Sequence, residues 1–120
     1  MGPTMQIVND AVLLRIFIGQ DDKAGHLPLY EAIVLKARKM HLAGATVLRG
    51  AVGFGRSTLL HTAKNLYLSQ DLPIVIEIVD AEDKVNEFLP ELEKLMGKVG
   101  SLVTLEKAKV LRYGNDAEGG

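Results

Sequence analysis

Two apolar runs with strand-like composition flank a long connection in the middle of this chain. The first run covers residues 46–54 and contains two glycines, and the second covers residues 74–79. The connection, residues 56–71, is introduced by Gly53-Phe54-Gly55-Arg56. Connections of this length are uncommon in small domains and generally carry function. The segment therefore predicts two paired strands and places a binding site at the end of the first.

The composition is that of one folded domain, and it excludes several classes of protein. The chain has 120 residues, 48% of them hydrophobic, which suffices for a single domain over residues 1–120 with its own core. A net charge of −1 argues against nucleic-acid binding driven by bulk electrostatics. The absence of cysteine excludes disulfides, thiolate metal sites and cysteine nucleophiles. With neither a spanning apolar run nor a signal peptide, we expect a cytoplasmic protein.

Hydrophobic periodicity predicts four strands and two helices. The strands are expected at residues 12–18, 46–54, 74–79 and 101–105, the last continuing past a bulge to residue 112. The first helix is expected from Pro28 to Ala43, with Gly44 at its end, and Asp80 is expected to cap the second. Pro90 predicts a kink or a shortened second helix. Residues 1–10 and 115–120 are expected to be flexible ends.

This order, βαββαβ, predicts an α+β, ferredoxin-like fold with a four-stranded antiparallel sheet and both helices on one face. The other face is too apolar for a surface that meets only water. In the first strand it carries Leu13 and Phe17 beside Arg15. We expect Arg15, Arg49 and Glu77 to pair across it. An apolar sheet face without helices indicates a partner surface, so we expect a homo-oligomer.

Five segments, together covering most of residues 13–113, resemble a known family. They are LPLYEAIVLKAR, GATVLRGAVGFG, HTAKNLYLSQDLPIVIEIVD, FLPELEKL and LVTLEKAKVLRY. The chain resembles the PII-like superfamily of trimeric signalling proteins, and most closely its uncharacterised DUF190 branch. Similarity to PII proper is confined to GFGR, LPIVIEIV and AKVLR.

The resemblance implies a homotrimer in which three sheets form a central barrel and residues 56–71 form the T-loop. PII proteins bind ATP or ADP in the cleft between neighbouring subunits. The positions that match this nucleotide site are Thr46, Gly53, Phe54, Gly55, Arg56 and Arg112. Backbone N–H groups of glycines and guanidinium groups both suit phosphate oxygens, so the matching residues have appropriate chemistry.

Three departures from PII weaken the implied phosphate site. The lysine that follows Leu-Pro in PII is Ile74 here, and the glutamine after the GFG-Arg run is Ser57. The glycine- and lysine-rich loop before the last strand is reduced to residues 97–100. We therefore hypothesise an effector with fewer phosphates, such as an adenine mononucleotide, from the set AMP, ADP, ATP and cyclic nucleotides. No cofactor is expected to be required.

The function implied is regulation rather than catalysis, because the sequence singles out no catalytic constellation and no P-loop. By resemblance, the effector would alter the order of residues 56–71, which would engage a membrane transporter or channel. One alternative is a ligand-free oligomeric adaptor. The other is a metal-binding protein of the CutA type, although His26, His41 and His61 lack a metal-ligand spacing and no metal ligand is predicted.

Overall fold

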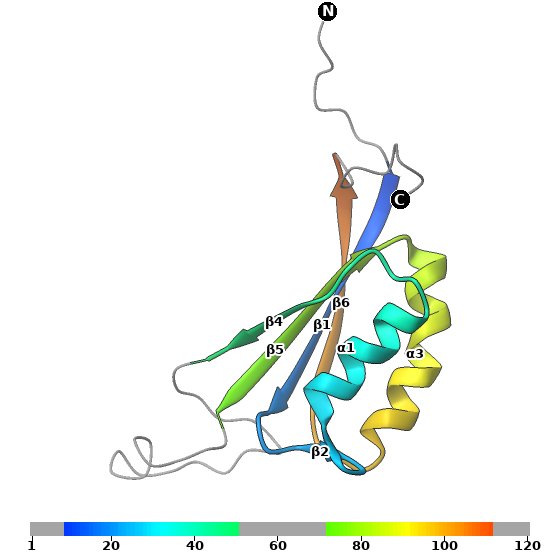
Figure 1. The fold of residues 1–120 in the computed structure, drawn as a ribbon. Coiled ribbons are helices and arrows are strands. Elements are labelled where there is room, and N and C mark those ends of the chain that lie inside the picture. Colours follow the sequence, from blue (N-terminus) through cyan, green and yellow to red (C-terminus); the bar gives the residue numbers. More distant parts are fainter. Residues whose placement is uncertain (1–8, 51–71, 112–120) are drawn as a thin grey trace, which may run out of the picture.

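The structure is a computed structural model that describes residues 9–50 and 72–111. Its elements follow one another along the chain as shown in Figure 1. They are β1 (Asn9–Gly19), β2 (Lys23–Ala24), β3 (Leu27–Pro28), α1 (Leu29–Lys39), β4 (Thr46–Arg49), β5 (Pro73–Asp80), α3 (Glu82–Met96) and β6 (Leu102–Val110). β1 begins two residues inside the amino-terminal end expected to be flexible, and the rest of both ends lies outside the described residues.

The main sheet has four strands in the order β4-β5-β1-β6, and every neighbouring pair is antiparallel. Helices α1 and α3 pack together on one side of it (Figure 1). This arrangement confirms the predicted ferredoxin-like α+β fold. Between β1 and α1 the structure adds a two-stranded hairpin of β2 and β3, which the hydrophobic periodicity did not predict, with Gly25 at a φ of 62° in its turn.

The core lies between the helices and the central strands β1 and β5. Alternate residues of these strands point toward the helices and are buried, as the two-residue periodicity predicted. From β1 and β5 they are Val12, Leu14, Ile16, Ile18, Ile74, Ile76 and Ile78. The helices contribute Leu29, Ile33, Ala37, Val85, Phe88 and Leu92, spaced to lie on one face of each helix.

Helix α1 ends earlier than the sequence predicted. Its last residue is Lys39, and His41 has a φ of 63°. The His41 N–H donates to the Arg38 carbonyl at 3.0 Å and the Leu42 N–H to the Ala37 carbonyl at 3.0 Å. This is the Schellman pattern, in which a left-handed residue lets two later N–H groups satisfy the last helical carbonyls. The prediction that Gly44 ends the helix is wrong, because His41 takes the left-handed position.

Asp80 is the last residue of β5 and not the cap of α3, which is Ala81. Its buried carboxylate accepts hydrogen bonds from the Ala81 N–H at 2.7 Å and from the Ala43 N–H at 2.8 Å. The Asp80 side chain therefore holds the connection between α1 and β4, at Ala43, close to the start of α3, at Ala81. Pro90 does not shorten α3, which continues through it to Met96.

The last strand has no bulge, which corrects the prediction. β6 keeps one register against β1, from Leu102 opposite Phe17 to Val110 opposite Asn9. The predicted second strand, residues 46–54, is seen as β4 up to Arg49, and its remaining residues after Gly50 lie outside the described part. The Gly50 N–H donates to the Pro73 carbonyl at 2.8 Å. A Cβ at position 50 would lie 2.8 Å from Pro73 Cγ, so any larger residue there would require the Pro73 ring or the strand to move.

Candidate functional site

The sheet side away from the helices is called the open face here. The registers of the four strands place one apolar row across all of them, made of Leu48, Val75, Phe17 and Leu102. The two ends of the row are the most accessible, with Leu48 48% exposed and Leu102 56% exposed. An apolar row across an uncovered sheet is typical of a contact surface, because exposing apolar side chains to water is unfavourable and a partner would bury them.

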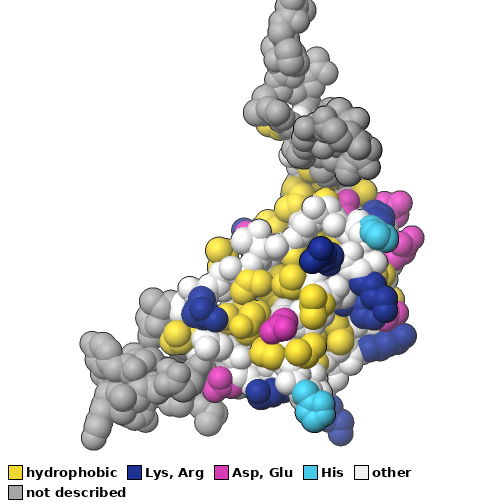
Figure 2. Space-filling model, viewed as in Figure 1, with side chains coloured by type: hydrophobic (Ala, Val, Ile, Leu, Met, Phe, Trp, Pro, Cys, Tyr) yellow, Lys and Arg dark blue, Asp and Glu magenta, His cyan; other side chains and the backbone are white. Residues whose placement is uncertain are grey.

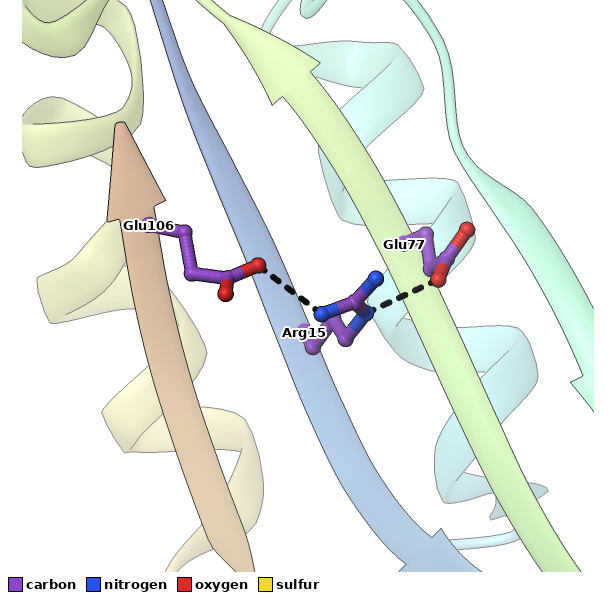
Figure 3. A network of polar contacts seen from close by, with 3 residues as sticks. All are labelled: Arg15, Glu77 and Glu106. Carbon is purple, nitrogen blue, oxygen red and sulfur yellow. Dashed lines mark hydrogen bonds and ion pairs between the residues drawn. The ribbon is translucent and has the colours of Figure 1, made fainter. Parts of the chain in front are cut away.

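A polar row lies next to the apolar row on the open face. It runs from Thr46 through Glu77 and Arg15 to Thr104. Arg15 Nε donates to Glu77 Oε2 at 2.9 Å, and Arg15 Nη1 donates to Glu106 Oε1 at 2.9 Å (Figure 3). The hydrogen bond to Glu77 raises the pKa of Arg15 above its ordinary value. Arg15, Glu77 and Glu106 are called the Arg15 cluster below.

The predicted pairing across the open face is confirmed in one part and wrong in another. Arg15 and Glu77 are opposite each other in the register and form the predicted ion pair. Arg49 is opposite Ile74 and therefore points to the helix side, where its Nε donates to Gln20 Oε1 at 3.0 Å. Sequence reasoning missed Glu106. Counting alternate residues along the last strand would have placed it on the open face with Leu102.

Of the six residues that matched the PII nucleotide site, the described structure contains Thr46 alone. Thr46 begins β4, is exposed and stands opposite Glu77 on the open face. The others lie outside the described residues, and they are Gly53, Phe54, Gly55, Arg56 and Arg112. Gly50 and Pro73, joined by their backbone hydrogen bond, mark the root from which residues 51–71 depart.

The position that carries the phosphate-binding lysine in PII proteins is turned away from the open face. Ile74 is fully buried in the core beneath the helices. A side chain at this position of β5 therefore points to the side of the sheet opposite to Thr46. The loop that precedes β6 is short, with Gly97 at a φ of 54° ending α3 and the Val99 N–H bonded to the Met96 carbonyl at 2.9 Å.

The helix surface carries acidic and basic side chains together (Figure 2). Glu91 on α3 contacts Lys94 at 3.3 Å and Lys36 of α1 at 3.6 Å. The Lys94 hydrogen bond, helped by the charge of Lys36, lowers the pKa of Glu91 below its ordinary value. Among residues 9–50 and 72–111, no group of three His, Cys, Asp or Glu side chains could hold a metal ion. No helix in the same ranges is long and apolar enough to cross a membrane.

The fold with its uncovered face defines the class of protein. Two structures of CPII, a nitrogen regulatory PII-like protein from Thiomonas intermedia K12, match it over 87% of this chain and 91% of theirs. The form bound to ADP, AMP and bicarbonate gives a TM-score of 0.60 at 16% identity, and the form bound to ADP and bicarbonate gives 0.63 at 18%. At these identities the likeness shows the fold, and the fold is PII-like.

Sequence similarity assigns the chain to one family within this fold class. It belongs to the DUF190 family, described as an uncharacterized ACR, which matches residues 11–110. A UPF0166 protein of Aquifex aeolicus is 37% identical over 99 residues, covering 82% of this chain and 91% of that protein. A UPF0166 protein of Methanocaldococcus jannaschii is 30% identical over 93 residues, covering 78% and 85%. The resemblance seen in the sequence is confirmed.

Proposed function

We propose that this chain is a PII-like regulatory protein that forms a homotrimer through the open face and senses an adenine nucleotide at the boundary between subunits. The observation that carries the proposal is the apolar row of the open face, which four strands share and which neither α1 nor α3 covers. Burial against two further copies would remove this row from water, at roughly 25 cal/mol per Å² of apolar surface. The nucleotide part is supported by CPII, which has the same fold and was solved with ADP and AMP.

The nucleotide contacts are proposed for the residues that match the PII site. Gly53, Phe54 and Gly55 would offer backbone N–H groups, Arg56 and Arg112 would bind phosphate oxygens, and Thr46 would contribute a hydroxyl. The buried position of Ile74 supports an effector with few phosphates, because the corresponding lysine of PII is missing and a side chain there points into the core. AMP or a cyclic nucleotide is therefore favoured over ATP.

The signalling step is proposed for residues 56–71. An effector that binds better when these residues are ordered shifts their population toward that state. The ordered segment would then engage a membrane transporter or channel, or release it. This role is regulatory and involves no chemical step.

A thermal-shift experiment with AMP, ADP, ATP and cyclic AMP tests the effector. A ligand present at about 100 times its Kd stabilises the folded state by about 2.7 kcal/mol, which raises the melting temperature measurably. We expect this rise in the wild type and its loss in Arg56→Ala and Arg112→Ala. Arg38→Ala is the matched control, because Arg38 is an exposed arginine on α1 and should leave the response unchanged.

Two results would contradict the proposal. If none of the four nucleotides raises the melting temperature, the effector is not an adenine nucleotide, and a trimer without response is the ligand-free adaptor. If Arg56→Ala and Arg112→Ala both respond like Arg38→Ala, the nucleotide binds elsewhere on the protein.

A further inference from the structure

The helix side of the molecule has a cavity of about 290 Å³ between the second half of α1 and the connection that leads to β4. Helix α1 packs on α3 and on the β2–β3 hairpin, which leaves this connection accessible. The lining is mainly aliphatic, with Val34, Ala37 and Leu42, and Arg38 is its one charged residue. Ligand sites in proteins begin at roughly 300 Å³, so the cavity has room for one large side chain or a small ligand.

Backbone and side-chain hydrogen bonds hold the walls of this cavity. The Ala43 N–H donates to the Asp80 carboxylate at 2.8 Å, and the Leu42 N–H donates to the Ala37 carbonyl at 3.0 Å. The wall formed by the connection is therefore tied both to α1 and to the end of β5. A site that is ordered before binding costs its ligand less conformational entropy.

The chain around the cavity is rich in cations and contains no acidic residue between positions 32 and 50. Lys36 lies 3.6 Å from Glu91 and is therefore partly neutralised. Arg38 and Lys39 are exposed, and neither forms an ion pair with another residue of the described ranges. Their two positive charges outweigh the partial negative charge of about −0.5 at the carboxyl end of a helix. The cavity therefore borders a positively charged surface.

Leu35 extends the apolar surface beside these cations. It is 48% exposed and precedes Arg38 and Lys39 by three and four residues, so the three side chains are neighbours on α1. Figure 2 shows hydrophobic side chains gathered on this side of the molecule, with Lys and Arg side chains around them. Glu31, one turn before Leu35, limits the positive surface to the second half of the helix.

His41 ends this surface in a conformation that glycine normally adopts. Its φ of 63° lies in the left-handed region, where a Cβ is unfavourable and glycine is preferred after a helix. The residue is exposed, so packing in the core does not account for a histidine here. Strained residues that the surrounding structure holds in place are frequent at binding sites. The imidazole provides a further hydrogen-bonding group next to Arg38 and Lys39.

We propose that the second half of α1 and the connection to β4 form a docking site for an acidic peptide segment of a partner protein. One apolar side chain of the peptide occupies the cavity, another covers Leu35, and its carboxylates bind Arg38, Lys39 and His41. Leu35 and His41 are separated by about 9 Å along the helix, at 1.5 Å per residue, which suits an extended peptide better than a small anion. The site lies on the helix side, so it stays accessible when open faces meet in the proposed trimer.

Selection from a displayed library of random peptides tests this inference. The wild-type protein is used for selection, and Arg38→Glu/Lys39→Glu is used for counter-selection, because reversing both charges should repel an acidic peptide. We expect the enriched peptides to have Asp or Glu on both sides of Leu, Ile or Phe. Circular dichroism establishes that the double variant is folded.

Fluorescence anisotropy with a labelled synthetic copy of the most enriched peptide measures the contribution of each side chain. Lys39→Ala should raise the Kd about threefold, as expected for one exposed ion pair. Lys23→Ala is the matched control, because Lys23 is an exposed lysine of the β2–β3 hairpin, and it should leave the Kd unchanged.

His41→Gly separates a role in binding from a role in folding. Glycine relieves the left-handed strain, so the melting temperature should stay the same or rise, while the Kd for the peptide should increase. An unchanged Kd in this variant would overturn the role of His41, because a loss of stability could not mask the effect.

Three further results would overturn the inference as a whole. The first is a selection in which no peptide distinguishes the wild type from Arg38→Glu/Lys39→Glu. The second is competition between the peptide and AMP, ADP, ATP or cyclic AMP, which would assign the cavity to a nucleotide. The third is a lower assembly mass of Arg38→Glu/Lys39→Glu in light scattering, which would identify the occupant as the acidic surface of a second copy.

The nucleotide response, measured without peptide, separates this inference from the proposed function. A protein that binds the selected peptide through Lys39 but responds to no nucleotide supports the docking site and refutes the effector. A protein that responds to a nucleotide but selects no acidic peptide refutes the docking site alone.

Discussion

Asp80 provides the sharpest test of how this fold holds the beginning of β4. The residue is 8% exposed, and its carboxylate accepts two backbone hydrogen bonds, from Ala43 at 2.8 Å and from Ala81 at 2.7 Å. A hydrogen bond to a charged group contributes about 1.5–3 kcal/mol. Ala43 is exposed, so in the variant water can partly replace the hydrogen bond that the Ala43 N–H loses. We therefore expect Asp80→Ala to lower the free energy of unfolding by about 2–4 kcal/mol, within the range of a lost buried network.

Urea denaturation measures this loss of stability. The protein concentration is kept the same for all variants, because the stability of a protein that assembles depends on its concentration. Asp80→Asn keeps one carbonyl oxygen as an acceptor and should lose about half as much as Asp80→Ala. Glu87→Ala, at an exposed position of the neighbouring helix, is the control and should change stability by less than about 0.5 kcal/mol. If Asp80→Ala behaves like Glu87→Ala, or if Asp80→Asn loses as much as Asp80→Ala, the two-bond account is refuted.

Two further predictions concern the root of the long connection and the helix surface. Gly50→Ala places a Cβ 2.8 Å from Pro73 Cγ, so it should lower the free energy of unfolding measured in urea by about 1–3 kcal/mol. The double variant Gly50→Ala/Pro73→Ala removes the clashing ring atom and should recover most of this loss. Equal losses in the single and double variants would contradict the steric explanation. The depressed pKa of Glu91 contributes stability above its unfolded pKa that is lost as pH falls through the folded value. Lys94→Ala should raise the Glu91 pKa measured by NMR, and an unchanged value would contradict the stated cause.

Most of the fold could be predicted because its central strands alternate strictly. β1 and β5 have apolar residues at every second position on the buried side, so their faces followed from periodicity, and the fold followed from the order of the elements. The hairpin of β2 and β3 was missed because two-residue strands are too short for any periodic pattern. The end of α1 was missed because His41, rather than a glycine, takes the left-handed position.

The candidate site could be predicted only where the strand register was already determined. Arg15 and Glu77 lie in the two central strands, so their shared face implied contact and the contact is seen. The partners of Arg49 and Glu106 depend on the register of the edge strands, which the periodicity alone leaves open by one residue. Arg49 lies on the helix side because the register of β4 differs by one residue from the register that was assumed. Glu106 was missed because a bulge was assumed in the last strand, whose register is continuous.

The charges of the open face explain why its apolar row is an incomplete basis for assembly. Among the described residues of the four strands, Arg15, Glu77 and Glu106 are the charged side chains on this face, which leaves one excess carboxylate in each copy. Copies that meet through this face bring like charges together while they bury the row that attracts them. Within a Debye length of about 8 Å at physiological salt, such repulsion is only partly screened. In the proposed trimer, the Arg15 cluster would therefore contribute to the specificity of the contact more than to its affinity, as partly buried ion networks often do.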